Sequence, residues 1–345
     1  HRREGLRYHL LDHPALPAHQ AGVGLARKIG MDEAAARLCA AGNPAGIIAG
    51  YDADCRCSGN YLTALAGFFQ DHPLAPAASV YFEHPLSGDG DARRAEGIVQ
   101  YELFLRYYVA GLRFSGHPHP FHTLGSCMAV RAGPYLAQGG MNRRKAGEDF
   151  YFLAKFMKLG NFGEINATTV RPAARLSHRV PFGTGRAMTD WMAGGQTELA
   201  VYAPEIFVDL KAFLAAVPRF LSPARGVPAP LPAGLPPPLA LFLEQASFPA
   251  RLAEILGKSR SREAAEKHFF HWFDRFRILK FAQFASERFY PRIPVALAAG
   301  ALLRLRDGKA PANHGPGAKG GGLPRPAAAA LLARLREEQR ADPGG

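Results

Sequence analysis

The strongest constraint on the fold of this chain is the alternation of short apolar segments with longer amphipathic segments over residues 1 to about 205. The apolar segments predict strands, and the amphipathic segments between them predict helices. Strands are expected at 6–11, 45–51, 78–85 and 123–133, and helices at 23–40, 61–70 and 97–114. Such alternation is typical of α/β proteins, in which helices cover both faces of a sheet.

Two changes of composition divide the rest of the chain. Residues 218–238 are rich in proline, which disfavours helices and central strands, so they predict a linker. We therefore expect an α/β domain at 1–205, a helical extension at 206–307 that contains the linker, and a low-complexity, disordered tail at 308–345. A short helix is expected within the tail, near "AAALLARLREEQ". Because the chain starts with His and its first segment reads as an interior strand, we expect the α/β domain to be N-terminally incomplete.

The net charge of the chain restricts only partly the classes of molecule that it could bind. A formal net charge of +13 predicts attraction to anions such as nucleotide phosphates, anionic lipids or nucleic acid. We expect no nucleic-acid partner, because the sequence contains no known nucleic-acid-binding module. No apolar run reaches the roughly 20 residues that span a bilayer, and the four cysteines lack a C-x-x-C spacing. The sequence thus predicts a cytoplasmic protein with reduced thiols.

Two carboxylates follow the strand expected at 45–51. Asp52 and Asp54 are one residue apart, where that strand reaches the surface. In an open α/β sheet, ligands bind beyond the carboxyl ends of the strands, and alternate side chains of a strand share a face. Such a pair of hard oxygen ligands suits Mg²⁺ or Mn²⁺, which recruits a substrate diphosphate. The alternative is a surface turn whose aspartates cap the following helix.

A second acidic pair opens a later helix. Glu148 and Asp149 follow Gly147, and the apolar stripe of the expected helix begins at Phe150. Acidic residues in a first turn are often only partners of the helix dipole. A carboxylate fixed beside a substrate pocket can also act as a general base.

These segments together resemble the family 2 glycosyltransferases of the GT-A fold. The resemblance is carried by "GVGLARKIGMDEAA", "GYDADC", "LGSCMAVRAGPYLAQGG" and "GEDFYF". It implies a GT-A (nucleotide-diphospho-sugar transferase) fold, with a Rossmann-like mixed sheet flanked by helices and a C-terminal helical extension. It also implies that Asp52 and Asp54 bind Mn²⁺ or Mg²⁺ and the donor diphosphate, and that Asp149 deprotonates the acceptor hydroxyl. Glu148 would orient this base or contact the acceptor, and Arg27 would reach the nucleotide, although a solvated helix face is an equal alternative for Arg27.

Further candidate residues lie in "VRPAARLSHRVPFGTGRAM", residues 170–188. Its arginines match phosphate geometry, and we expect Arg179 and Arg186 to bind the donor diphosphate. By the resemblance, His178 could add a metal ligand. A solvated basic loop is the alternative. Glu83 and His84 end the strand expected at 78–85 and could line the acceptor pocket, although such a pair is more often an ordinary strand exit.

The expected function follows from the resemblance. The enzyme would be an inverting, hexosyltransferase-like glycosyltransferase that moves a sugar from a nucleotide-sugar donor to a carbohydrate or lipid-linked acceptor. The Q-x-x-R-W motif of processive members is absent, so we expect non-processive transfer. Its basic surface would suit peripheral contact with the inner face of the membrane. The alternative is a non-catalytic basic protein that binds polyanions or an anionic membrane through the basic, aromatic run 268–292.

Overall fold

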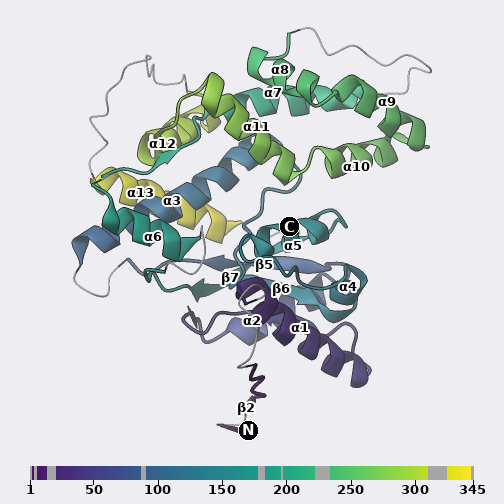
Figure 1. Ribbon diagram of the computed structural model, residues 1–345, viewed down its shortest axis with the longest axis vertical. Coiled ribbons are helices and arrows are strands. Elements are labelled where there is room, and N and C mark those ends of the chain that lie inside the picture. Colours follow the sequence, from purple (N-terminus) through teal and green to yellow (C-terminus); the bar gives the residue numbers. More distant parts are fainter. Residues whose placement is uncertain are drawn as a thin grey trace.

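The computed structural model describes residues 2–3, 6–13, 21–86, 91–177, 183–195, 197–221, 234–309 and 325–342. These residues form a mixed sheet flanked by helices, with further helices packed above it (Figure 1). This is the mixed α/β architecture with a C-terminal helical region that the sequence predicts. The predicted domain limits stay predictions.

The central sheet has five strands in the order β3-β6-β5-β7-β4. Strands β3, β5 and β7 run in one direction, and β6 and β4 run in the other. The strands are β3 (Ile47–Gly50), β4 (Arg56–Cys57), β5 (Ala77–Phe82), β6 (Met128–Arg131) and β7 (Gly163–Arg171). Two short antiparallel pairs lie outside this sheet: β1 (Arg2–Arg3) with β2 (Leu6–Arg7), and β8 (Ala200–Val201) with β9 (Ile293–Pro294).

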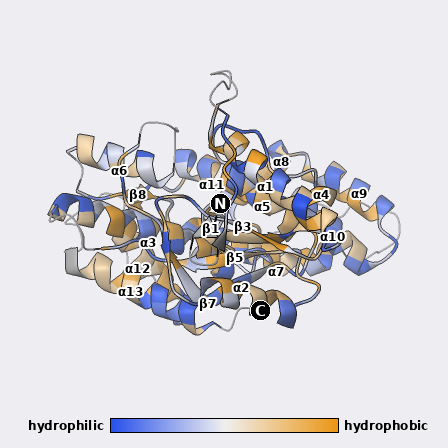
Figure 2. Ribbon diagram, turned by 90° about the horizontal axis from the view of Figure 1, so that it is seen from below, coloured by the Kyte–Doolittle hydropathy of each residue, from blue (hydrophilic) through white to orange (hydrophobic). Residues whose placement is uncertain are grey.

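Side-chain alternation along the strands builds two apolar layers. Met128 and Val130 of β6 join one hydrophobic cluster, whereas Ala129 and the preceding residue Cys127 join the other. This period of two is that of a strand buried on both faces. The first layer is covered by α1 (Val23–Ala40), α4 (Ala132–Ala137) and α5 (Glu148–Met157), and the second by α2 (Tyr61–Asp71). Figure 2 shows the hydrophobic residues of the sheet between these helices.

A larger hydrophobic cluster joins most of the remaining helices, and α3 (Ala92–Phe114) takes part in it through Leu103 and Tyr107. These helices are α6 (Thr184–Ala193), α7 (Glu205–Phe220), α8 (Pro237–Gln245), α9 (Phe248–Lys258), α10 (Arg262–Trp272), α11 (Arg275–Arg288), α12 (Val295–Arg306) and α13 (Arg325–Ala341). Every one of them except α6 contributes buried side chains to the cluster. The helical extension therefore shares an apolar core with a helix of the predicted α/β domain.

Two expectations need correction. The segment 6–11 is not an interior strand of the sheet, because only Leu6–Arg7 is extended and its partner is β1. Leu10 and Leu11 are exposed, and an apolar run of six residues does not by itself specify a sheet neighbour. The second concerns the helix expected within the tail, which does form, as α13. There α13 buries Ala328, Leu332 and Leu335 against the helical core, so the expected short helix is longer and packed.

Candidate active site at the carboxyl edge of the sheet

The strand directions gather several candidate residues at one edge of the sheet. Asp52 follows the carboxyl end of β3, and Glu83 follows the carboxyl end of β5. Gly125 precedes the amino end of β6, which meets the same edge because β6 is antiparallel to both neighbours. Ligands bind at this edge in open α/β sheets.

Arg27 of α1 connects two of the carboxylates at this edge. Its guanidinium donates to both carboxylate oxygens of Asp52, at 2.7 and 2.8 Å, and to Glu148 from the other terminal nitrogen. Arg27 and Glu148 are almost fully buried, whereas the Asp52 side chain is 41% exposed. The alternative of a solvated helix face therefore does not hold for Arg27, and its contact with a nucleotide stays a prediction. Its buried Nε has no hydrogen-bond partner among the described residues.

Asp149 lies beside this ion-pair cluster and is held by backbone groups. Its carboxylate oxygens accept hydrogen bonds from the N–H of Gly125 at 2.9 Å and from the N–H of Phe150 at 2.7 Å. Gly147 begins the helix with a φ of 66°, in the left-handed region that favours glycine. At Gly125, a Cβ atom would overlap the Arg27 guanidinium, so a larger residue would require Arg27 to shift from its present position.

Burial changes the proton affinity of both acidic groups. The pKa of Glu148 is raised to about 6, first by burial and then by the charge of Asp149, although Arg27 opposes the shift. Burial also raises the pKa of Asp149, again against the effect of Arg27 and of the N–H groups that donate to it. A raised pKa makes a carboxylate a stronger proton acceptor, which favours a role as general base.

Asp54 has a different partner, Arg175. The Arg175 Nε lies 2.5 Å from Asp54 Oδ2, and the Asp54 side chain is 26% exposed. Arg175 belongs to the arginine-rich segment, so part of that segment does reach the carboxylate pair. Arg186 instead pairs with Asp190 one turn further along α6. His178 and Arg179 lie outside the described residues.

His84 and Glu83 lie at the predicted edge but are engaged by the protein. His84 is buried, and its Nδ1 lies 3.1 Å from Glu102 of α3. Arg336 of α13 also binds Glu102, at 2.6 Å. Arg340 of α13 binds Glu83 at 2.5 Å. In this arrangement α13 covers both residues, so His84 acts as part of the core and not as an open acceptor contact.

The buried Glu102 anchors this second cluster. Burial alone would raise the pKa of Glu102, but hydrogen bonds from His84 and Arg336 and the charge of Arg106 outweigh it. The pKa of Glu102 is therefore held well below its ordinary value. The carboxylate is ionised and fully partnered, which makes it structural.

Two residues that the sequence does not single out lie between the clusters. Tyr101 of α3 hydrogen-bonds Thr184 of α6, and the charge of Asp149 acts on its hydroxyl. Burial, the larger cause, raises the pKa of Tyr101 to about 12. The Thr184 hydroxyl lies 3.4 Å from His84 Nε2. Neither residue belongs to a motif. The only sequence signal for Tyr101 is the apolar stripe of the helix expected at 97–114.

The donor set at this edge fits a weakly held hard cation. Asp52 and Asp54 offer carboxylate oxygens that are partly exposed, and each carboxylate pairs with an arginine. Within the described ranges, no group of three or more His, Cys, Asp or Glu side chains could hold a metal ion. Mg²⁺ binds through one or two carboxylates plus water and substrate phosphate, so two carboxylates suffice for it.

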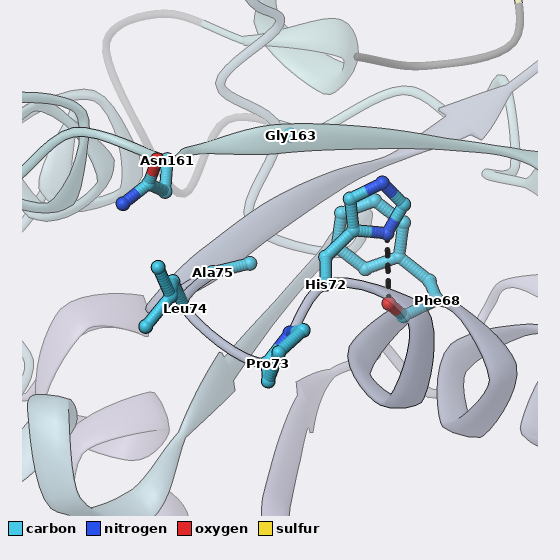
Figure 3. A pocket seen from close by; sticks show the side chains of 7 residues that line it. All are labelled: Phe68, His72, Pro73, Leu74, Ala75, Asn161 and Gly163. Atoms are coloured by element: carbon cyan, nitrogen blue, oxygen red, sulfur yellow. Dashed lines mark hydrogen bonds between the residues drawn. The ribbon is translucent and has the colours of Figure 1, made fainter.

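A separate hollow lies at the opposite edge of the sheet. It has a volume of about 270 Å³ and is lined by Leu74 and Ala75 before β5 and by Asn161 and Gly163 at the start of β7 (Figure 3). The ring of His72 stacks on Phe68 beside it and bonds the Phe68 carbonyl at 3.0 Å. Since the amino ends of β5 and β7 form this hollow, it is not part of the candidate site.

Comparison with known proteins adds no relative. No family model matches the chain, and neither a curated protein nor a solved structure matches it significantly. Across the residues that the structure describes, no helix combines the length and apolar character needed to cross a bilayer. Any function must therefore be argued from the residues of the chain itself.

Proposed function

We propose that this chain is a glycosyltransferase of the GT-A type, which moves a sugar from a nucleotide-diphosphate donor to an acceptor hydroxyl. One observation carries the proposal: Arg27, Asp52, Glu148 and Asp149 come from three separate segments and meet at the carboxyl edge of the sheet. The motifs that resemble family 2 glycosyltransferases are the segments that supply them. A structural surface turn would not require such convergence.

The residues at the edge can be given roles. Asp52 and Asp54 would hold Mn²⁺ or Mg²⁺, which would neutralise the charge that develops on the departing diphosphate. Arg175 beside Asp54 is placed to contact a phosphate group in the manner expected of the arginine-rich segment. Arg27 keeps Asp52 and Glu148 at a fixed separation, so the carboxylates do not repel one another.

Asp149 is the proposed base. Backbone N–H groups orient its carboxylate, and each oxygen keeps a lone pair that can take a proton. It would accept the acceptor hydroxyl proton as that oxygen attacks the anomeric carbon and the bond from this carbon to the diphosphate breaks. Such a displacement inverts the anomeric centre. Glu148, the preceding residue of the same helix turn, would orient this base or contact the acceptor.

The alternative, a non-catalytic polyanion- or membrane-binding protein, is less well supported. Most aromatic residues of the run that would carry it are used in the core: Phe269, Phe273 and Phe281 are fully buried. Phe276 is 39% exposed. Polyanion binding should weaken steeply with salt, whereas metal-dependent nucleotide binding should respond mainly to a chelator.

The proposal is tested by donor turnover. The protein is incubated with a panel of nucleotide sugars and Mn²⁺, and release of nucleoside diphosphate is measured with and without sugar acceptors. Asp149→Asn should lower release by about 100-fold or more, the usual contribution of a general base. Asp71→Asn, the same change on the exposed end of α2, is the matched control. Equal release by wild type and Asp149→Asn would contradict the role of Asp149.

A further inference from the structure

A second cavity lies away from the carboxyl-edge site, among helices α3, α7, α12 and α13. Its volume is about 490 Å³. Its lining includes Arg113 and Phe114 of α3, Lys211 of α7 and Arg306 of α12, and α13 closes one side with Leu335. None of the carboxylates at the candidate active site lines it.

The cavity wall is rich in positive charge. Four cationic side chains line it, namely Arg106, Arg113, Lys211 and Arg306, against one carboxylate, that of Glu338. Arg106 is itself buried and is balanced by the buried Glu102, whereas Arg113 is balanced by the buried Glu164 and lies 3.9 Å from the partly exposed Asp342; none of these carboxylates lines the cavity. The exposed part of the wall therefore presents more positive than negative charge.

Lys211 is the cation with the most freedom. Its ammonium lies 4.2 Å from the centre of the Phe114 ring, and it has no carboxylate partner in the described part of the chain. Arg306, by contrast, forms a two-point ion pair with Glu338, at 2.7 Å for each hydrogen bond. An ammonium ion held over an aromatic ring at a cavity mouth is available to a ligand.

His122 adds an uncharged polar group. It lines the cavity, is 5% exposed, and contacts the Phe82 ring edge-on. Burial, with the charges of Arg106 and Arg113, holds its pKa well below the ordinary value, so the imidazole is neutral. A neutral imidazole carries one donor and one acceptor nitrogen, so a ligand in the cavity can hydrogen-bond to this ring.

We propose that this cavity binds a small organic phosphate. Lys211 and Arg113 would contact the phosphate, His122 would donate a hydrogen bond to it, and Phe114 with Leu335 would cover its apolar part. Phosphate is favoured over a single carboxylate because a guanidinium fork and an ammonium converge on one cavity. The inference does not rest on the glycosyltransferase proposal.

The test uses phenyl phosphate, whose ring resembles no nucleotide. Binding to the full chain is measured by calorimetry in EDTA at constant ionic strength, with phenol and inorganic phosphate as comparison ligands. Lys211→Glu should weaken phenyl phosphate binding at least about tenfold, the loss of one charge-assisted contact. Lys267→Glu makes the same change on the exposed face of α10 and should bind as the wild type does.

The variant Asp52→Asn/Asp54→Asn separates the two sites. Unchanged phenyl phosphate affinity in this variant, with loss in Lys211→Glu, would support the cavity. Loss in Asp52→Asn/Asp54→Asn with unchanged affinity in Lys211→Glu would place the ligand at the carboxyl edge and overturn the proposal. Equal affinity for inorganic phosphate would overturn the assignment to an organic phosphate. Absence of phenyl phosphate binding at millimolar concentration would overturn it altogether.

Discussion

Arg27 donates to both carboxylate oxygens of Asp52, at 2.7 and 2.8 Å, across two segments that lie 25 positions apart. The same guanidinium also binds Glu148. One cation thus holds together the two acidic motifs that the sequence analysis singles out. The account of the site depends on this arrangement.

Removal of Arg27 should destabilise the fold. Arg27→Ala would leave the buried Glu148 without its partner, at an expected cost of about 3 kcal/mol in the free energy of unfolding, measured with urea. Arg37→Ala, on the exposed face of the same helix, removes an i,i+4 pair with Glu33 and should cost less than about 0.5 kcal/mol. Equal effects of the two changes would show that the cluster is not a buried ion pair.

Glu148 should make stability depend on pH. Because its folded pKa of about 6 exceeds the value of 4.5 for the free side chain, its favourable contribution is full below pH 4.5 and is lost as pH rises through 6. The stability difference between wild type and Glu148→Gln should therefore fall by about 2 kcal/mol over this window. Asp209, whose pKa burial raises to about 6, titrates in the same window, so only this difference isolates Glu148.

Stability curves at several pH values check the prediction for Glu148. Glu266→Gln, on the exposed face of α10, should have the wild-type pH profile. A Glu148→Gln profile parallel to that of the wild type would contradict the raised pKa.

Arg336 should be required for docking of α13. Arg336→Ala would remove two hydrogen bonds to the fully buried Glu102 and should cost about 2–3 kcal/mol in unfolding free energy. Arg334→Ala, on the exposed side of the same helix, should cost less than about 1 kcal/mol. Amide hydrogen exchange would show whether α13 detaches, and unchanged protection in Arg336→Ala would argue against this anchor.

Two arginines of the arginine-rich segment, Arg175 and Arg186, should differ in function. Arg175→Ala should weaken nucleoside diphosphate binding about tenfold, because Arg175 lies against Asp54 and can reach a phosphate. Arg186→Ala should bind as the wild type does, because Arg186 pairs with Asp190 in its own helix. The opposite result would restore Arg186 as the diphosphate contact that the sequence predicts.

The sequence predicts those helices and strands whose buried residues are apolar, because their apolar pattern then matches their burial in the fold. The strands at β3, β5 and β6 and helices α1, α2 and α3 all form where they are expected. Strand β7 is not marked by its hydrophobicity, because it buries Glu164, Thr168 and Thr169. Glu164 is tolerated there because Arg113 and Gln339, distant in sequence, both bind it.

The sequence predicts only those residues of the candidate site that belong to its motifs. Asp52, Glu148 and Asp149 do meet, but the arginine that joins them could not be distinguished from a solvated residue by helix position alone. The covering of Glu83 and His84 by α13 depends on contacts more than 250 positions apart, which no local pattern encodes.

The most direct test of the account is metal-dependent binding of nucleoside diphosphates. Calorimetry with a panel of these nucleotides, with and without Mn²⁺, compares the wild type with Asp52→Asn/Asp54→Asn and with Asp71→Asn as the matched control. We predict binding that requires Mn²⁺, prefers one nucleobase, and is lost in the double variant but kept in the control. Binding that is independent of Mn²⁺ and unchanged in the double variant would contradict the assignment of Asp52 and Asp54 as the metal and diphosphate ligands.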